Sequence, residues 1–256
     1  MANYDMNDKV VFVTGAGKGI GRATAKRFGE AGASVVVSDH TTEDQKLAVV
    51  DEIEDAGGEA MFIKADASDP GDMKALVEET VDSYGQLDYA INNAATSERN
   101  NSLVEKNPDE FREVFELNML GTWAGMREEI PAILETGGGA IVNTASTTGL
   151  TGVPGLEFYS SSKHAVLGLT KSAAIEIAPD NIRINAVCPN FIMTQALADY
   201  YEANPEQEES EREKIPMDRF GDPEEVASAI VWLVSDEASY MTGESISIEG
   251  GKMAGL

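Results

Sequence analysis

The chain has 256 residues with 45 acidic and 19 basic side chains, so its formal net charge at pH 7 is −26. A charge of this size and sign repels the phosphates of nucleic acids and of anionic membrane surfaces, and we expect neither as a partner. Hydrophobic residues make up 42% of the chain, which excludes a disordered polyanion and allows one large core.

Short runs rich in β-branched residues alternate along the chain with longer segments of helical periodicity. Because helical segments connect most of these runs, the pattern predicts βαβ units and a doubly wound, mostly parallel α/β sheet of the Rossmann type with helices on both faces. No change of composition marks a linker, so we predict a single domain over residues 1–256. The seven predicted strands are residues 10–14, 34–38, 60–64, 87–92, 139–144, 182–187 and 244–248.

Two helical segments carry complete start signals. Asn107 and Asp222 are each followed by a proline and, three residues on, by a glutamate. This pattern predicts a capping box at the start of each helix. The segment 195–215 is the expected substrate lid, and six glutamates between residues 202 and 213 indicate a solvated helical face rather than a metal site.

A glycine-rich turn, TGAGKGIG at residues 14–21, follows the first strand directly and precedes a helical segment over 22–31. Glycine permits positive φ and close approach of the backbone to a pyrophosphate, and the N-terminus of the following helix offers free N–H groups. The order of strand, turn and helix therefore predicts a dinucleotide site. Its expected cofactor-binding residues are Gly15, Lys18, Gly19, Ile20 and Gly21.

Asp39 ends the second strand, where dinucleotide folds place the acid that binds the adenosine ribose. A 2′-phosphate beside this carboxylate would suffer like-charge repulsion, and His40, the next residue, does not supply the arginine that would accommodate it. Lys18 favours the phosphate, but more weakly than Asp39 opposes it. We therefore predict NAD as the cofactor, with NADP disfavoured.

Tyr159 and Lys163 lie four residues apart in a helix predicted over 157–178, so their side chains share one helix face. Lowering a tyrosine pKa from about 10 by about three units requires about 4 kcal/mol. An ammonium at about 4 Å supplies roughly that amount at an effective dielectric constant near 20. Ser146 lies just beyond the strand at 139–144, where a strand end and a helix start can bring its hydroxyl to the phenol.

Taken together, the motifs resemble those of the short-chain dehydrogenase/reductase family, in its branch of chains of this length. The resemblance covers nearly the whole chain, and several motifs in the right order are more specific than any one of them. They are TGAGKGIG at 14–21, Asp66 after the third strand, NNAA at 92–95, Asn118 in ELNMLG, Ser146 in IVNTAS, YSSSK at 159–163, CPNFIMT at 188–194 and TGESISIEGG at 242–251.

The resemblance implies roles for these residues. Tyr159 would exchange a proton with the carbonyl oxygen, and Lys163 would lower its pKa and hold the nicotinamide ribose. Ser146 would hydrogen-bond the reacting oxygen, and Asn118 would anchor a water that relays protons. Further cofactor contacts are implied for Asp66, Ala67, Asn92, Asn93, Ala94, Pro189, Ile192 and Thr194.

Two positions depart from the family pattern, which commonly has NNAG and Pro-Gly where this chain has Ala95 and Asn190. We expect an altered pocket shape rather than lost activity, because asparagine tolerates positive φ. Residues near the reacting centre have a mixed polarity that suits a sugar, a polyol or another small hydroxylated molecule. They are Thr96, Thr148, Glu157, Asn190 and Met193.

The predicted activity is the NAD-dependent interconversion of a secondary alcohol and a ketone, with Tyr159 as general acid/base. Reduction of 3-oxoacyl or cyclic ketone substrates is an alternative, and a non-catalytic NAD sensor is a third that the complete catalytic set disfavours. A sugar-nucleotide epimerase of the related longer branch would carry glycine at position 18 and a longer C-terminal domain, and both are missing.

Cys188 is the only cysteine, so the sequence gives no sign of an oxidising compartment. Residues 1–9 lack the features of a signal peptide, and no stretch is apolar enough to span a membrane, so we expect a cytoplasmic protein. His40 and His164 belong to no ligand cluster, and we expect no metal. The resemblance implies a homotetramer or dimer acting on a small molecule.

The acidic residues are spread through the chain, and lysine occupies only 11 positions, which predicts a halophilic protein. Salt at about 1 M shortens the Debye length to about 3 Å and so screens repulsion between surface carboxylates. We expect the midpoint of thermal unfolding to rise between about 0.1 M and about 2 M KCl. A midpoint that stays constant or falls over this range would show that the surface is merely acidic.

Overall fold

The computed structural model describes residues 4–40 and 43–255, so the segment considered for a signal peptide is described only from residue 4. The strands of this part form one sheet in the order β3-β2-β1-β4-β5-β6-β7, with every neighbouring pair parallel. The predicted α/β fold is confirmed, and the sheet is wholly rather than mostly parallel. The strands are Val10–Thr14 (β1), Ser34–Asp39 (β2), Glu59–Lys64 (β3), Tyr89–Asn92 (β4), Gly139–Thr144 (β5), Ile182–Pro189 (β6) and Ser245–Ile248 (β7).

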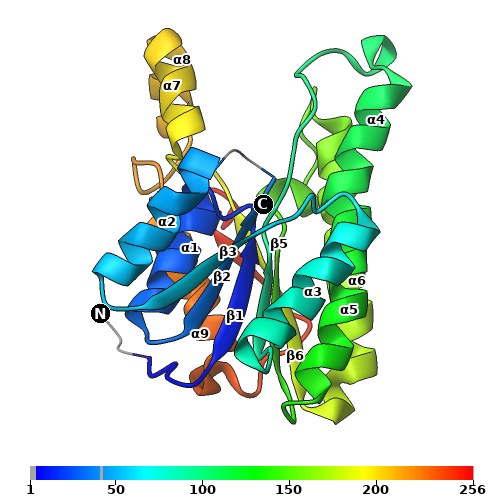
Figure 1. The fold of residues 1–256 in the computed structure, drawn as a ribbon. Coiled ribbons are helices and arrows are strands. Elements are labelled where there is room, and N and C mark those ends of the chain that lie inside the picture. Colours follow the sequence, from blue (N-terminus) through cyan, green and yellow to red (C-terminus); the bar gives the residue numbers. More distant parts are fainter. Residues whose placement is uncertain (1–3, 41–42, 256) are drawn as a thin grey trace.

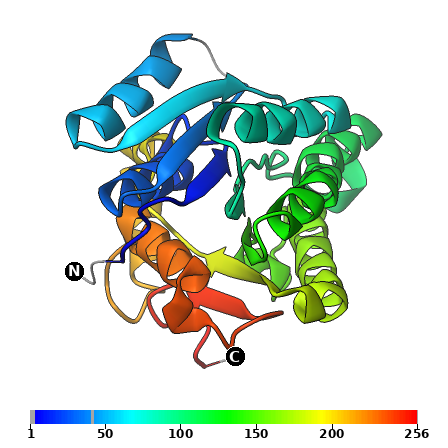
Figure 2. The same ribbon diagram turned by 60° about the horizontal axis from the view of Figure 1, so that its bottom comes forward.

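Helices cover both faces of this sheet, as Figure 1 and Figure 2 show. Helices α1, α2 and α9 pack on one face, and α3, α5 and α6 pack on the other. The helices are Gly19–Glu30 (α1), Glu43–Asp55 (α2), Pro70–Tyr84 (α3), Pro108–Phe115 (α4), Thr122–Leu134 (α5), Glu157–Ile177 (α6), Gln195–Ala203 (α7), Pro205–Arg212 (α8) and Pro223–Val234 (α9).

The side chains of β1 alternate between the two cores. Val11 and Val13 pack in the core under α1 and α9, which also contains Phe28. Phe12, between them, packs in the opposite core with Leu76 of α3. Successive strand residues point to opposite faces, so burial on both sides requires the nearly continuous apolar runs seen in the sequence.

Both predicted capping boxes are present. The side chain of Asn107 accepts the N–H of Asp109 at 2.6 Å, and Glu225 accepts the N–H of Asp222 at 2.9 Å. Glu225 also forms a bidentate pair with Arg219, which holds the pKa of Glu225 down to about 2. These signals lie within a few residues of each other, which is why they could be recognised without tertiary information.

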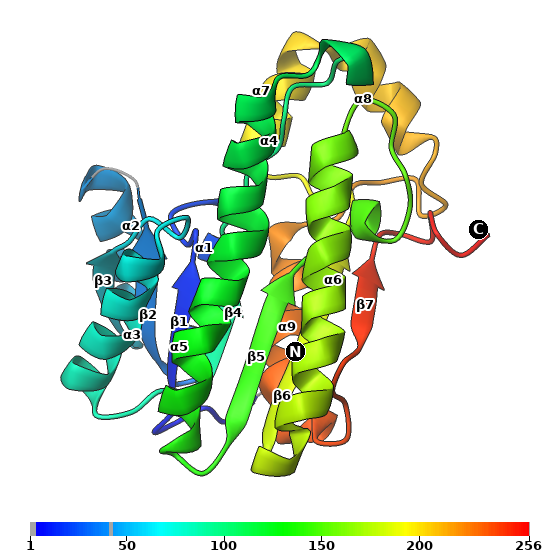
Figure 3. The same ribbon diagram turned by 90° about the vertical axis from the view of Figure 1, so that its right-hand side faces the viewer.

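The carboxyl ends of the strands meet at one edge of the sheet, and Figure 3 shows α4, α7 and α8 extending beyond that edge. Strand β1 pairs with both β2 and β4, so the winding of the chain reverses there. Such a reversal leaves a crevice between the loops that follow the two strands, where doubly wound folds bind ligands. A π-helical segment, Glu116–Gly121, joins α4 to α5 beside it.

A buried polar network connects the sheet to α5 and α6. The side-chain amide of Asn92 donates to Glu129 at 3.1 Å and to Asn143 at 3.0 Å, and Asn143 donates to Thr170 at 2.9 Å. Glu129 is fully buried, and burial raises its pKa to about 8. The carboxyl group therefore keeps its proton at neutral pH, because the interior solvates its charged form poorly.

Replacing Glu129 by glutamine should change how stability depends on pH. The unfolded chain releases the Glu129 proton near pH 4.5, whereas the folded protein holds it up to about pH 8. This group therefore lowers the free energy of unfolding as pH rises between those values, by up to about 1.4 kcal/mol per pH unit. Glu129→Gln should lose this decrease, so its stability relative to the wild type should rise with pH.

Chemical unfolding at about pH 5 and about pH 8 measures the effect. Glu135→Gln is the matched control, because Glu135 lies on the solvent side just after α5 and should leave the pH dependence unchanged. A stability difference between Glu129→Gln and the wild type that is equal at the two pH values would contradict the assignment.

Candidate active site

A cleft of about 580 Å³ lies at the carboxyl edge of the sheet, between the loops after β1, β2, β3 and β4. The start of α7 and the segment joining α4 to α5 complete its walls. The sequence-predicted cofactor residues that line it are Gly15, Lys18, Gly19, Ile20, Asp39, Asp66, Ala67, Asn93, Ala94 and Thr194. Gly21 and Pro189 are buried outside this lining, and Ile192 lines a neighbouring pocket.

The glycine turn is shaped for close backbone approach. Gly15 and Gly19 have φ of +61° and +55°, which other residues adopt at a cost. A Cβ atom added to Gly21 would lie 2.2 Å from the carbonyl oxygen of Gly15, so the turn and α1 pack too tightly for a side chain. The first turn of α1 has no acidic residue and no side-chain cap, so its N–H groups suit an anionic group. The turn therefore fits the pyrophosphate of a dinucleotide.

Two carboxylates stand at the wall formed by β2 and β3. Asp39 is 5% exposed, and it accepts the N–H of Gly17 at 2.9 Å. His40 Nδ1 lies 3.3 Å from the other oxygen of Asp39. Asp66 accepts both the hydroxyl and the N–H of Ser68, which lowers its pKa. The Asp39 carboxylate is thus fixed against the glycine turn at the end of β2.

The four predicted catalytic residues are linked by hydrogen bonds and short contacts. A hydrogen bond joins Tyr159 to Ser146, and Lys163 Nζ lies 5.6 Å from the centre of the Tyr159 ring. Ser162 donates its hydroxyl to the carbonyl of Tyr159 at 2.8 Å and accepts the side-chain amide of Asn118 at 3.0 Å. The end of β5, the start of α6 and the π-helical segment therefore meet at one place.

Asn118 is fully buried within the π-helical segment. Its side chain accepts the N–H of Thr96 and donates to the carbonyl of Thr96, each at 2.9 Å. It thereby ties the π-helical turn to the loop after β4. Single π-helical turns frequently occur at functional sites, because the extra residue redirects backbone groups.

The pKa of Tyr159 differs from the expectation based on spacing. Burial raises it, and the hydrogen bond with Ser146 only partly opposes this effect. Lys163 is 2% exposed and donates its ammonium to the carbonyl oxygen of Thr144 at 2.7 Å. Burial also lowers the pKa of Lys163 to about 8. Burial therefore has the largest effect on the Tyr159 pKa in this structure, and the lowering of that pKa by Lys163 stays a prediction.

Residues predicted to face the substrate have different surroundings. The N–H of Thr148 donates to Ser146 at 3.2 Å, next to the catalytic cluster. Glu157 pairs instead with Lys106 at 3.3 Å and accepts the N–H of Gly155. Met193 packs on an apolar cluster made by the buried side chains of Tyr201, Ile215 and Phe220. The carboxylate of Glu157, which the sequence places near the substrate, is thus already paired with Lys106.

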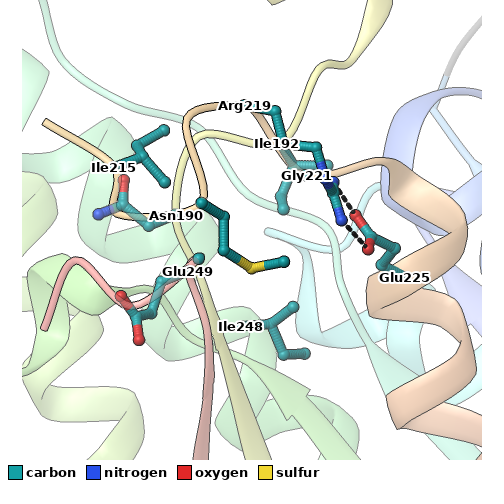
Figure 4. A pocket seen from close by; sticks show the side chains of 10 residues that line it. Asn190, Ile192, Ile215, Arg219, Gly221, Glu225, Ile248 and Glu249 are labelled. Carbon is teal, nitrogen blue, oxygen red and sulfur yellow. Dashed lines mark hydrogen bonds and ion pairs between the residues drawn. The ribbon is translucent and has the colours of Figure 1, made fainter. Parts of the chain in front are cut away.

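Asn190 lies in a smaller pocket of about 100 Å³, which Figure 4 shows between the ends of β6 and β7. Ile192 and Ile248 form apolar parts of its wall, and the Arg219–Glu225 pair closes one side. This pocket does not include the residues of the catalytic cluster.

The segment 195–215 contains α7 and α8, and its role as a substrate lid stays a prediction. Helix α8 buries none of its side chains, which confirms the predicted solvated face. Shortly before this segment, the positive φ considered for Asn190 falls instead on Phe191, at +47°. The centres of the Phe191 and Phe220 rings are 6.0 Å apart. Lys252 Nζ lies 4.1 Å from the centre of the Phe191 ring. Aromatic packing and a cation thus hold this strained residue in place.

Two further candidate functional residues, Glu98 and Lys106, were not identified from the sequence. Glu98 is a buried carboxylate that accepts the N–H groups of Phe158 and Tyr159, at 2.8 and 2.9 Å. Lys106 Nζ lies 3.2 Å from Glu98. Both residues come from the loop region after β4, about 50 to 60 positions before α6, and no local pattern marks them.

Within the described residues, no group of three or more histidine, cysteine, aspartate or glutamate side chains is arranged to hold a metal ion. A search of the same residues finds no helix with both the length and the apolar character needed to cross a membrane.

Known proteins are similar to this chain in both sequence and fold. A family model described as enoyl-(acyl carrier protein) reductase matches residues 15–252. A cyclohexanol dehydrogenase from Acinetobacter sp. (strain SE19) is 45% identical, covering 95% of this chain and 94% of that protein. A 2,5-dichloro-2,5-cyclohexadiene-1,4-diol dehydrogenase from Sphingobium indicum is 39% identical, covering 96% of this chain and 98% of that protein.

The crystal structure of a short-chain type dehydrogenase/reductase from Mycobacterium marinum superposes with a TM-score of 0.89 at 33% identity, covering 98% of each chain. The agreement in sequence and fold thus extends over nearly the whole length of this chain and of these proteins. The chain therefore belongs to the short-chain dehydrogenase/reductase family of NAD(P)-dependent oxidoreductases.

Proposed function

We propose that the protein interconverts a small, uncharged secondary alcohol and its ketone, with NAD as the preferred cofactor and an alicyclic alcohol as the substrate class. The observation that carries the proposal is the cluster of Ser146, Tyr159 and Lys163 beyond the carboxyl end of β5, at the edge of the sheet where the dinucleotide cleft also lies. A non-catalytic NAD sensor would have no use for this cluster.

The glycine turn would hold the pyrophosphate, and Asp39 would hold the adenosine ribose. Asp66 and Ala67 would border the adenine, and Thr194 would contact the carboxamide. When bound, the nicotinamide supplies the hydride acceptor or donor. The preference for NAD is supported by Asp39, which is buried and fixed by Gly17, so that its charge would oppose a 2′-phosphate. Lys18 is exposed and less constrained.

The proton would move at the phenol oxygen of Tyr159, which takes it from the alcohol in oxidation and returns it to the ketone oxygen in reduction. Ser146 would donate a hydrogen bond to the same substrate oxygen and stabilise the charge that develops there. Lys163 would hold the cofactor ribose, and Asn118 would anchor a water that passes the proton to solvent. The buried setting strengthens these interactions, because few water dipoles compete.

An apolar substrate suits the surroundings of the cluster better than a polyol does. The carboxylate of Glu157 is engaged by Lys106, and Met193 packs on the apolar cluster of Tyr201, Ile215 and Phe220. The glutamates of α8 would repel phosphorylated or carboxylated substrates. Both curated relatives described above are named for ring-shaped alcohols. The cytoplasmic location and the homotetramer or dimer stay predictions.

Tyr159→Phe removes only the hydroxyl and should lower kcat by at least about 100-fold, because the substrate oxygen loses its acid/base group. The dissociation constant for NAD should change little, since the phenol oxygen acts at the substrate. Tyr84→Phe is a matched control, because Tyr84 ends α3 outside the cleft lining. Full activity in Tyr159→Phe would refute the role given to Tyr159.

Reduced-nicotinamide absorbance should reveal oxidation of cyclohexanol in preference to xylitol or a 3-hydroxyacyl thioester. With cyclohexanol, kcat/KM for NAD should exceed that for NADP by at least about tenfold, or about 1.4 kcal/mol. Asp39→Asn should lower this ratio of the two kcat/KM values, whereas Asp82→Asn, an exposed substitution on α3 outside the cleft lining, should leave the ratio unchanged. Equal values for the two cofactors would overturn the NAD preference. Silence with every substrate, despite NAD binding, would favour the sensor.

A further inference from the structure

The first turn of α6 carries Tyr159 as its third residue, and its N–H groups need acceptors outside the helix. Leu156, at the position where a cap usually lies, has no side chain that can accept a hydrogen bond. Glu98 takes this place from a distant loop. Its Oε1 accepts the N–H of Phe158 at 2.8 Å, and its Oε2 accepts the N–H of Tyr159 at 2.9 Å.

The Glu98 carboxylate is unusual because its side chain is 0% exposed. A buried carboxylate is strongly destabilising unless it is paired and hydrogen-bonded. Lys106 provides the pair, with its Nζ 3.2 Å from Glu98 and its side chain 1% exposed. The same ammonium donates to the carbonyl of Gly155 at 2.9 Å and lies 3.3 Å from Glu157. A buried ion pair thus sits directly behind the backbone of Tyr159.

We propose that Glu98 is a positioning residue for the reaction, which clamps the backbone of Tyr159 so that the phenol meets Ser146, while Lys106 balances its charge. The proposal deepens the proposed function, because it assigns to this pair a part in controlling the proposed acid/base group. A neutral cap such as serine or asparagine would satisfy one N–H without placing a charge there. The bidentate carboxylate fixes two successive N–H groups.

Charges from several elements face Tyr159. Lys163 lies on the same helix, Glu157 opens that helix, and Cys188 on β6 lies near Lys163. Glu98 and Lys106 approach from the loop region after β4. Among these, the negative charge of Glu98 raises the pKa of Tyr159. Removing that charge should therefore favour the phenolate, whereas removing the Lys106 cation leaves Glu98 uncompensated and should disfavour it.

The test compares Glu98→Gln, Lys106→Met and the double variant, with Glu105→Gln as a matched control because Glu105 is exposed in the same loop region. The titration of Tyr159 is read from tyrosinate absorbance, as the difference between each protein and its Tyr159→Phe counterpart, with and without NAD. The pH dependence of kcat/KM for alcohol oxidation is measured in parallel, and melting temperature reports on folding.

Glu98→Gln should shift both titrations to lower pH by about one unit, and Lys106→Met should shift them to higher pH by a similar amount. The double variant, which replaces an ion pair by neutral groups of similar size, should fall near the wild type. Removing one partner alone leaves an uncompensated buried charge and destabilises the protein. If a single variant fails to fold for this reason, the double variant and the other single variant still provide the titrations.

Titrations that move in the same direction in both single variants, or not at all, would overturn the proposal and leave Glu98 as a helix cap alone. The absorbance readout needs no turnover. If no alcohol is oxidised but the phenol titrations shift in opposite directions, the proposed function fails while the coupling of Glu98 and Lys106 to Tyr159 stands.

Discussion

Parallel pairing of all the strands is the constraint on which the site depends, because it brings their carboxyl ends to one edge. At the centre of that edge, Thr14 at the end of β1 is hydrogen-bonded to the loop after β4. Its hydroxyl accepts the N–H groups of Asn93 and Ala94, at 3.0 and 3.1 Å, while Asn93 donates back to the Thr14 carbonyl at 3.0 Å. These reciprocal bonds hold the glycine turn and the loop after β4 in one rigid wall. The cleft is therefore largely formed by backbone geometry before any ligand contributes.

Features that depend on neighbouring residues could be predicted from the sequence. Strand runs, capping boxes and the four-residue spacing of Tyr159 and Lys163 all follow from local periodicity, and they locate the cleft and the catalytic cluster. The polarity of the site could not be predicted in the same way. Glu98 accepts the N–H of Tyr159 at the N-terminus of α6, although the two residues are 61 positions apart in the sequence. Glu129 is fully buried, but nothing in the sequence distinguishes it from the other acidic residues, 45 in all. Sequence spacing reveals the Lys163 cation near Tyr159, but not the burial that raises the pKa of the phenol.

The buried acids show three different ways of tolerating a carboxyl group in the interior. Asp88 accepts the Lys9 ammonium and the N–H of Val10, both at 2.9 Å, and so stays paired. Glu129 has only the amide of Asn92 as a partner, and a pKa raised to about 8 keeps it neutral. Glu98 combines two backbone N–H groups with a buried lysine. In this third arrangement both charged side chains are buried, whereas Lys9, the partner of Asp88, is partly exposed, and it is the buried pair that lies behind Tyr159.

This distinction separates the chemistry of the site from the large charge of the surface. Mobile ions screen exposed carboxylates such as those of α8 within a few ångströms at high salt, but they reach a buried pair poorly. The Glu98–Lys106 pair and the Lys163 ammonium are nearly inaccessible, so their proposed effect on Tyr159 should persist at ionic strengths that screen repulsion between surface charges. A chain with a net charge of −26 can therefore respond to salt in its stability and solubility while the proton affinity of Tyr159, the proposed acid/base group, is set by a few buried neighbours.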